Sequence, residues 1–217
     1  MEEYYRKRAA EYEDIYKKPE RQEALRAIRS YLKEPFSGKD VLEIACGTGY
    51  WTEELAHTAH SIIATDINDA VLDIARVKTY RGCQPVFENN DAFEISINGS
   101  FNACFAGFWF SHIKIEQYRR FFNNLHRHVV PGATIVFLDN LYVDGSSTPI
   151  SRTDEHGNTY QNRHLKDGTK FEVVKNFPSE HCLTELIMPY AASLRYKDFA
   201  YYWAIEYVLG NQSFING

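Results

Sequence analysis

The sequence lacks the features that mark several specialised classes of protein. It contains no apolar run near the roughly 20 residues that span a bilayer, and it begins without the apolar segment of a signal peptide. Its four cysteines lie far apart, with no CxxC pair and no histidines nearby at metal-ligand spacing. We therefore expect a cytoplasmic protein with reduced thiols, no membrane contact and no bound metal.

Clustered positive charge is also lacking. The chain of 217 residues carries 24 Lys and Arg against 29 Asp and Glu, a formal net charge of -5. The densest basic run, Arg6-Lys7-Arg8, stands among glutamates at positions 2, 3 and 11, as on the solvated face of a helix. Proteins that bind nucleic acid need clustered Lys and Arg to displace counterions from phosphates, so no nucleic-acid partner is expected.

What the sequence does contain is a regular alternation of short apolar strands and amphipathic helices. Two helical patterns, over residues 4–16 and 25–32, precede the first strand. Five strands then alternate with helices, at residues 41–45, 61–66, 85–89, 102–107 and 133–139. This order predicts an α/β fold with a doubly wound, mostly parallel sheet. Ligands of such sheets bind at the carboxyl ends of the strands, beside the first strand.

The alternation stops near Asn140. A loop rich in Gly, Ser and Thr follows, and two short strands then flank Asp167-Gly168, a strong hairpin-turn signal. A helix capped by Ser179 and two final strands complete the pattern. We expect a single domain of about seven strands with three parts: N-terminal cap helices over 1–36, a ligand-binding core over 37–140, and a last part over 141–217 that holds a small hairpin insertion after the fifth strand and the final strands.

The motif with the most chemical content is Glu43-Ile44-Ala45-Cys46-Gly47-Thr48-Gly49, in which an acidic residue ends a strand and a glycine turn opens a helix. Glycines permit positive φ and close approach of a ligand, and the helix presents unpaired N–H groups. Thr52 stands where the dinucleotide-binding fingerprint requires a third glycine. The carboxylate of Glu43 would also repel a pyrophosphate but suits a cationic amino group.

This motif closely resembles the first motif of the class I S-adenosylmethionine-dependent methyltransferases, acid-x-Gly-x-Gly-x-Gly, with Ala45 in place of the first glycine. The resemblance continues in order at the ends of later strands. It implies S-adenosylmethionine as cofactor and S-adenosylhomocysteine as product. The cofactor-binding residues that it implies are Arg8, Tyr12, Glu43, Ala45, Gly47, Gly49, Asp66, Ile67, Asn90, Asp91, Ala92 and Phe108.

Four of these residues have a specific role in the resemblance. Asp66 would accept hydrogen bonds from both ribose hydroxyls, and Asp91 would bind the adenine amino group. Phe108 would lie near the sulfonium, and Arg8 would bind the methionyl carboxylate. Structural alternatives remain open, because Asp66 could cap the next helix and Asp91 could only shape a turn.

Aromatic residues and one histidine are the candidates for the acceptor site. His112 follows the fourth strand, where an imidazole could remove a proton from an acceptor hydroxyl or amine, although a structural histidine is an equal alternative. The other predicted substrate residues are Trp109, Tyr142, Tyr160 and Tyr202, and packing in the core is the alternative for each. Aromatic walls would suit an aromatic or amine-bearing acceptor.

The sequence thus predicts a methyltransferase that acts on the oxygen or nitrogen of a small molecule, as a monomer or homodimer. Two other functions stay open: an NAD(P)-dependent oxidoreductase on a similar sheet, and a non-catalytic domain that binds S-adenosylmethionine. The Asn/Asp-Pro-Pro-aromatic motif of nucleic-acid amino methylases is not present after the fourth strand, where Gly107-Phe108-Trp109-Phe110 stands instead.

Overall fold

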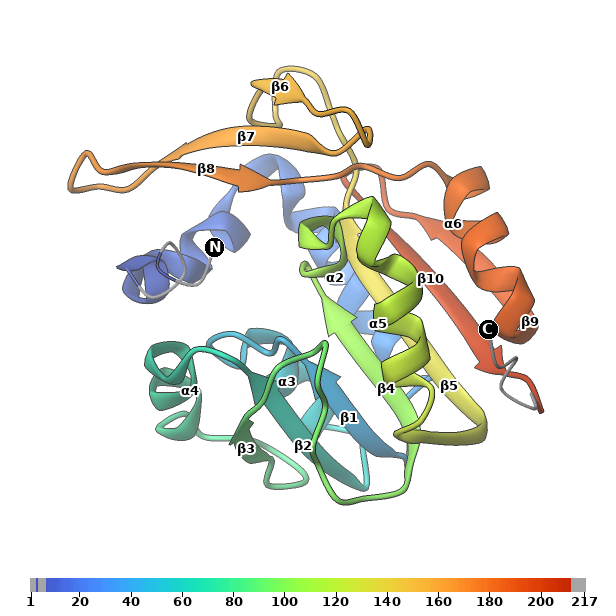
Figure 1. Cartoon of the computed structure of the whole chain (residues 1–217). Helices are drawn as coiled ribbons and strands as arrows, with labels where there is room; N and C mark the ends of the chain where they lie inside the picture. Colours follow the sequence, from blue (N-terminus) through green and yellow to red (C-terminus); the bar gives the residue numbers. More distant parts are fainter. Residues whose placement is uncertain (1–2, 4–6, 212–217) are drawn as a thin grey trace.

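A computed structural model describes residue 3 and residues 7–211, without the side chains of residues 9, 10 and 12. Its centre is a seven-stranded sheet in the order β3-β2-β1-β4-β5-β10-β9 (Figure 1). The strands are β1 (Asp40–Ile44), β2 (Ser61–Asp66), β3 (Val86–Asn89), β4 (Phe101–Gly107), β5 (Val129–Asn140), β9 (Ala191–Asp198) and β10 (Tyr202–Leu209). The predicted doubly wound, mostly parallel fold is confirmed.

Strand direction follows the sequence pattern. β3, β2, β1, β4 and β5 pair in parallel, as buried apolar runs joined by helical crossovers do. β10 pairs antiparallel with both β5 and β9, and β9 is the edge strand on that side of the sheet. The strand order reverses between β1 and β4, so the carboxyl ends of these two strands mark the expected ligand-binding edge.

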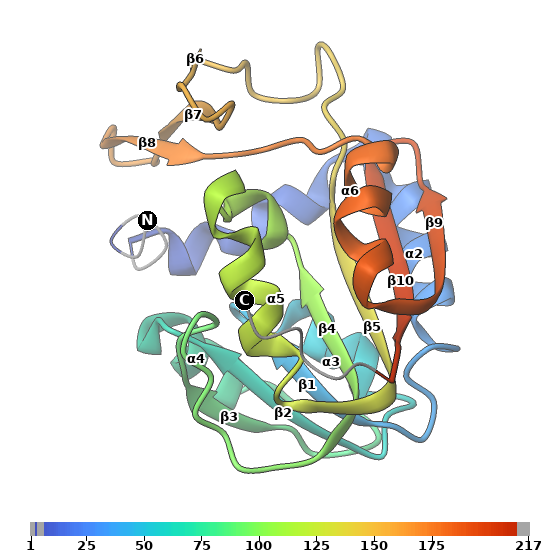
Figure 2. The same cartoon turned by 45° about the vertical axis from the view of Figure 1, so that its right-hand side comes forward.

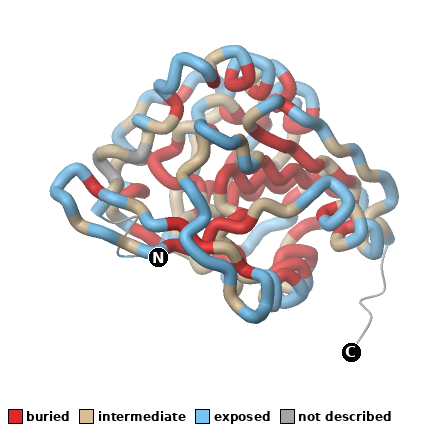
Figure 3. The backbone as a smooth tube through the Cα atoms, turned by 90° about the horizontal axis from the view of Figure 1, so that it is seen from above, coloured by how far each residue is buried: buried red, intermediate tan, exposed pale blue. Residues whose placement is uncertain are grey.

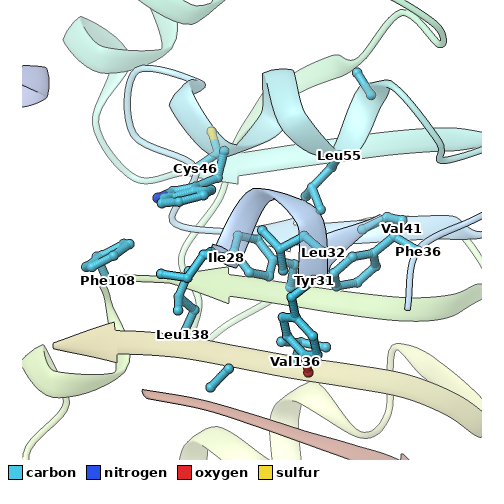
Figure 4. Close-up of a cluster of buried hydrophobic side chains, with 14 of the residues drawn as sticks. Ile28, Tyr31, Leu32, Phe36, Val41, Cys46, Leu55, Phe108, Val136 and Leu138 are labelled. Atoms are coloured by element: carbon cyan, nitrogen blue, oxygen red, sulfur yellow. The ribbon is translucent and has the colours of Figure 1, made fainter. Parts of the chain in front are cut away.

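Helices cover both faces of the sheet and bury two hydrophobic clusters. α2 (Gln22–Leu32), α3 (Tyr50–Ala56) and α4 (Asp69–Arg76) pack on one face, and Figure 4 shows part of that cluster, including Ile28, Leu32 and Leu55. α5 (Tyr118–Leu125) and α6 (Glu180–Ile187) pack on the other. Seen from above, the central strands are buried and the surrounding loops are exposed (Figure 3).

Two helices begin at the caps that their sequences supply. The side chain of Asn68 accepts the N–H of Ala70 at the start of α4, and Ser179 accepts that of Cys182 at the start of α6, as predicted for Ser179. Within the first helix, expected over residues 4–16, residues 7 and 8 are α-helical and residues 9–16 belong to the 3-10 helix η1 (Ala9–Lys17), which leads through η2 (Pro19–Arg21) into α2. Residues 4–6 of that expectation lie outside the described residues.

The predicted hairpin belongs to a second, three-stranded sheet. β6 (Arg152–Thr153), β7 (Thr159–His164) and β8 (Lys170–Val174) pair antiparallel, with Gly168 at φ +84° in the turn. This small sheet projects over the carboxyl ends of β4 and β5, beside the N-terminal segment (Figures 1 and 2). The ammonium of Lys166 donates to the carboxylate of Asp14 in η1 at 2.9 Å, so the turn of the hairpin contacts the N-terminal segment.

Membrane spans and metal clusters are both absent from the described residues. None of the helices in this part of the chain is long and apolar enough to cross a membrane. The same residues contain no group of three or more His, Cys, Asp or Glu side chains that could hold a metal ion.

Candidate functional site

The turn between β1 and α3 has the conformation that its glycines permit. Ala45, Gly47 and Gly49 all have positive φ, at 53°, 57° and 77°. Gly49 is the N-cap of α3, and its N–H bonds the carbonyl of Cys46 at 3.1 Å. A Cβ at Gly49 would clash with the Tyr80 hydroxyl and lie 3.1 Å from the Cβ of Ala75, so this position needs glycine for space as well as for conformation.

Asp66 lies at the tip of β2, next to this turn. Its Oδ2 accepts the N–H of Gly47 at 3.0 Å, and its Oδ1 accepts the N–H of Asn68 at 2.9 Å. Burial raises the pKa of Asp66 to about 6, and these backbone donors oppose the rise. The cap of α4 is Asn68, so Asp66 orders the turn rather than capping the helix. Ile67 beside it is 47% exposed, an apolar surface that a flat ring could cover.

The loop after β3 contains the next three predicted cofactor residues. Asp91 accepts the N–H of Phe93 at 2.8 Å, so it shapes a turn, as its structural alternative requires. Asn90 and Ser96 exchange two hydrogen bonds, of 3.0 and 3.3 Å. Ala92 is buried. The loop is therefore fixed at the same strand edge as Asp66, and Asp91 remains half-buried there.

The environment of Glu43 differs from the one that its expected role requires. The side chain is 1% exposed, and its Oε2 has no hydrogen-bond partner among the described residues. Burial raises the pKa of Glu43 to about 8, against a smaller opposing effect of Thr52. The carboxyl group therefore lies beneath the turn and is largely neutral at pH 7. The expected attraction of its negative charge for an amino group is not supported by this position.

Phe108 sits at the end of β4 in a strained conformation, with φ +60°. Its N–H bonds the carbonyl of Leu138 at 2.6 Å, and its ring stacks on Trp51 at 5.7 Å between centroids. Figure 4 shows Phe108 at the edge of the buried cluster, at the end that also holds Cys46. Of the three residues other than glycine with positive φ in the described chain, two, Ala45 and Phe108, lie at the tips of β1 and β4.

A pocket opens beside Phe108, between the main sheet, the N-terminal segment and the hairpin sheet. Five of its lining side chains are Lys or Arg, and none of the described lining residues is Asp or Glu. The lining residues are Arg8, Ile15, Lys18, Arg21, Phe108, His112, Asn140, Ser146, Ser147, Thr148, Gln161, Arg163, Val173, Lys175 and Phe177. A cleft lined by one sign of charge attracts ligands of the opposite sign.

Neighbouring side chains hold two of these cations in fixed positions. Arg21 is 7% exposed and donates to the Ser146 hydroxyl at 2.9 Å, while the ring of Tyr202 lies 5.5 Å from its guanidinium carbon. Arg163 donates to Gln161 at 2.6 Å and to the Thr148 hydroxyl at 3.0 Å. Two ordered guanidinium groups can bind an oxyanion through several parallel hydrogen bonds.

His112 lines the same pocket. Its Nδ1 lies 2.6 Å from the carbonyl of Val174, which can only accept, so Nδ1 carries a proton. Burial and the positive charge of Lys175 hold the pKa of His112 far below its usual value. The imidazole is therefore neutral near pH 7.

The other predicted substrate residues lie outside the pocket lining. Trp109 packs between Phe93 and Phe121 on the α5 side, and the exposed Tyr142 contacts Phe177. Tyr160 donates to Asp154 from within the hairpin sheet. Tyr202 packs behind Phe108. The expectation that these four aromatic residues form the pocket wall is corrected: Phe108 and Phe177 are the aromatic residues among the described lining residues, and most of the others are polar or charged.

The N-terminal predictions have different outcomes. Arg8 lines the pocket, but the side chain of Tyr12 lies outside the part that the structure describes. The segment is attached to the glycine turn by Glu13, which accepts the Thr48 hydroxyl at 2.7 Å and pairs with Lys78 at 2.5 Å.

Sequence interpretation missed most of the polar pocket residues, including Lys18, Arg21, Asn140, Arg163 and Lys175. One local signal was present: Gln161 and Arg163 are two residues apart on β7 and so project from the same face.

Comparisons with known proteins agree with this arrangement. Residues 41–132 match a family model described as "Methyltransferase domain". The solved structure "DhpI-SAH complex structure" is 27% identical, with a TM-score of 0.75 over 97% of this chain and 95% of that one. "DhpI-SAM-HEP complex" is 25% identical, with a TM-score of 0.77 over 94% of each chain. A SAM-dependent methyltransferase from Methanosarcina mazei is 17% identical, with a TM-score of 0.66 over 86% of this chain and 98% of that one, which indicates a shared fold. A search of curated proteins found no significant match.

Proposed function

Because the chain is a class I S-adenosylmethionine-dependent methyltransferase, we propose that it methylates an anionic oxygen of a small molecule. The observation that carries the proposal is the charge of the pocket beside Phe108. Five cationic side chains line it, and no carboxylate is among its described lining residues. A protonated amine would be repelled there, whereas an oxyanion would be attracted by the positive charge and would accept hydrogen bonds from the cations.

The residues at the strand tips fit the cofactor. The glycine turn brings backbone close to the space above β1, Asp66 offers a carboxylate, and Ile67 an exposed apolar surface. Gly47, Gly49, Asp66, Asp91 and Phe108 would hold the nucleoside and the sulfur end. When bound, S-adenosylmethionine supplies an electrophilic methyl group, which the acceptor oxygen takes with the loss of one negative charge.

The chain's contribution is to bind and orient the acceptor. Arg21, Arg163 and Lys175 would hold the anionic group and direct one oxygen toward the cofactor side of the pocket. An oxygen that is already ionised needs no base, so catalysis is mainly positioning and exclusion of water. The neutral imidazole of His112 then acts as a polar wall of the pocket rather than as an obligatory base.

Similarity to a solved complex adds support. The structure "DhpI-SAM-HEP complex" has a second named component together with SAM, and its chain resembles this one over nearly the whole length. This favours a site that takes cofactor and acceptor together over a domain that only senses the cofactor. It also disfavours the alternative of an NAD(P)-dependent oxidoreductase.

A panel of small acceptors tests the proposal. Purified protein with labelled S-adenosylmethionine would be offered small phosphonates, carboxylates, phenols and amines, with product detected by mass spectrometry. We expect O-methylation of an anionic acceptor, competitively inhibited by sulfate. Transfer only to amines or neutral phenols would refute the anionic class.

A pair of arginine variants connects that activity to the pocket. Arg21→Gln removes a lining charge and should weaken sulfate binding by about tenfold or more while S-adenosylhomocysteine binding persists. Arg26→Gln is the matched control, since Arg26 is exposed on α2 and is not among the pocket-lining residues. Equal sulfate affinities in the two variants would contradict the assignment of Arg21.

A further inference from the structure

A buried carboxylate that no prediction had singled out lies directly behind the pocket wall. Asp139, near the end of β5, is 0% exposed and accepts four hydrogen bonds. Its Oδ2 accepts the N–H of Ser111 at 2.8 Å. Its Oδ1 accepts the ammonium of Lys175 at 2.9 Å and the backbone and side-chain N–H groups of Asn140 at 2.7 and 3.0 Å. Asp139 thus joins three segments that meet at the pocket.

Two of its partners line the pocket. Lys175 is 4% exposed and also donates to the Ser111 hydroxyl at 2.5 Å. An ammonium group has three N–H donors, so the bonds to Asp139 and Ser111 leave one that can point to a molecule in the pocket. Asn140 in turn accepts from Arg21 at 3.4 Å. The position of a single carboxylate therefore sets the position of several groups that face the acceptor.

The charges around Lys175 make its protonation depend on this contact. Arg163 from β7 and Arg8 from the N-terminal segment face it with the same sign, and His112 from the turn after β4 is neutral. Burial lowers the pKa of Lys175, and the negative charge of Asp139 opposes that fall. A lysine buried among cations without a counter-ion would release its proton.

We propose that Asp139 is a positioning residue of the acceptor site, which fixes Lys175 and Asn140 and keeps Lys175 charged so that it can bind the acceptor's anionic oxygen. The proposal rests on the anionic acceptor proposed above. The ion pair is not needed as a stabilising contact in itself, because a buried pair often contributes no more than a well-packed apolar one. What it supplies is a fixed positive charge at the pocket wall.

The test is the pH dependence of anion binding. Sulfate is the probe, because its double charge stays constant between about pH 6 and pH 9, so any change belongs to the protein. Calorimetry would measure its affinity for protein loaded with S-adenosylhomocysteine. In the native chain we expect the affinity to change by less than about threefold over this range, and in Asp139→Asn to fall by about tenfold or more as the pH rises.

Three further variants separate charge from shape. Asp139→Asn combined with Lys175→Arg should restore a flat profile, because a guanidinium stays charged at these pH values. Lys175→Gln should bind sulfate weakly at every pH. Asp144→Asn, an exposed carboxylate on the neighbouring loop, should behave like the native chain. A flat profile for Asp139→Asn, or native affinity in Lys175→Gln, would overturn the proposal.

A second measurement needs no anion and so separates this proposal from that of the acceptor class. The NMR signal of the Lys175 Cε carbon, assigned from its loss in Lys175→Arg, reports the charge directly. We expect a charged Lys175 at pH 7 in the native chain and a neutral one in Asp139→Asn. Native protein that binds no sulfate would refute the acceptor class alone. Identical titration of Lys175 in both chains would refute the role of Asp139 alone. If Asp139→Asn does not fold, the native chain alone still tests the role of Asp139. A Lys175 that is neutral at pH 7 in the native chain would overturn that role.

Discussion

Asp66 and Gly47 are joined across the tips of two neighbouring strands, since the Oδ2 of Asp66 accepts the backbone N–H of Gly47 over 3.0 Å. The carboxylate that is expected to bind the ribose therefore also orders the turn that approaches the cofactor. Loss of its negative charge would disturb both functions together.

The first prediction concerns the pH dependence of cofactor binding. Burial raises the pKa of Asp66 to about 6 in the free protein, and binding of ribose hydroxyls requires the ionised form. The affinity for S-adenosylhomocysteine should then fall by about tenfold between pH 7.5 and pH 5, as the carboxylate takes up a proton. Calorimetry at a series of pH values measures this fall. Asp66→Asn should bind weakly with little pH dependence, and a fall of the same size in that variant would assign the effect to another group.

The second prediction concerns Glu43 and stability. Its folded pKa of about 8 lies above its ordinary value of 4.5, so between these values the folded chain keeps a proton that the unfolded chain releases. The free energy of unfolding should therefore fall by roughly 2 to 4 kcal/mol as the pH rises through that window. Urea unfolding of Glu43→Gln should show a shallower decline between pH 5 and pH 8 than the native chain. An unchanged slope would mean that Glu43 is already ionised in the folded protein.

The third prediction uses two glycines with similar backbone angles. Gly49 and Gly132 have φ of +77° and +82°, but a Cβ would meet the Tyr80 hydroxyl at Gly49 and nothing within 4 Å at Gly132. Gly132→Ala should destabilise the fold by about 1 kcal/mol through backbone strain, and Gly49→Ala by about 1 to 3 kcal/mol more through the added clash. Thermal unfolding compares them. Equal losses would show that Tyr80 moves aside without cost.

The fourth prediction concerns His112. Its pKa lies far below the usual value, and an ionised acceptor needs no base, so kcat should stay within about twofold between pH 6 and pH 8. His112→Gln should keep the shape of this profile. An inflection near pH 6.5 that disappears in His112→Gln would instead identify the imidazole as a general base.

Much of the cofactor side could be predicted from the sequence because its determinants are local. Gly47 and Gly49 punctuate one turn, and Asp66 ends the next apolar strand. In a parallel sheet the carboxyl ends of neighbouring strands lie at one edge, so order along the chain was enough to bring these residues together. The burial of Glu43 could not be predicted in this way, because the direction of its side chain depends on how α3 packs.

The pocket proposed for the acceptor could not be predicted because its residues come from distant segments. The five cations of the pocket stand at positions 8, 18, 21, 163 and 175, so no basic cluster appears in the sequence. They meet only after the hairpin sheet folds over the main sheet. Aromatic residues such as Tyr160 and Tyr202 were more conspicuous in the sequence, but neither is among the described residues that line the pocket. Alternation along β7 was the usable signal, since it places Gln161 and Arg163 on one face.

The most direct test of the account is a calorimetric titration of the native chain and of Asp66→Ala with S-adenosylhomocysteine and with NAD+. We predict that the native chain binds the nucleoside and releases no heat with NAD+, and that Asp66→Ala loses about tenfold to a hundredfold in affinity. Asp73→Ala, which changes an exposed carboxylate on α4, should retain native affinity. Binding of NAD+ without S-adenosylhomocysteine, or native affinity in Asp66→Ala, would contradict the account.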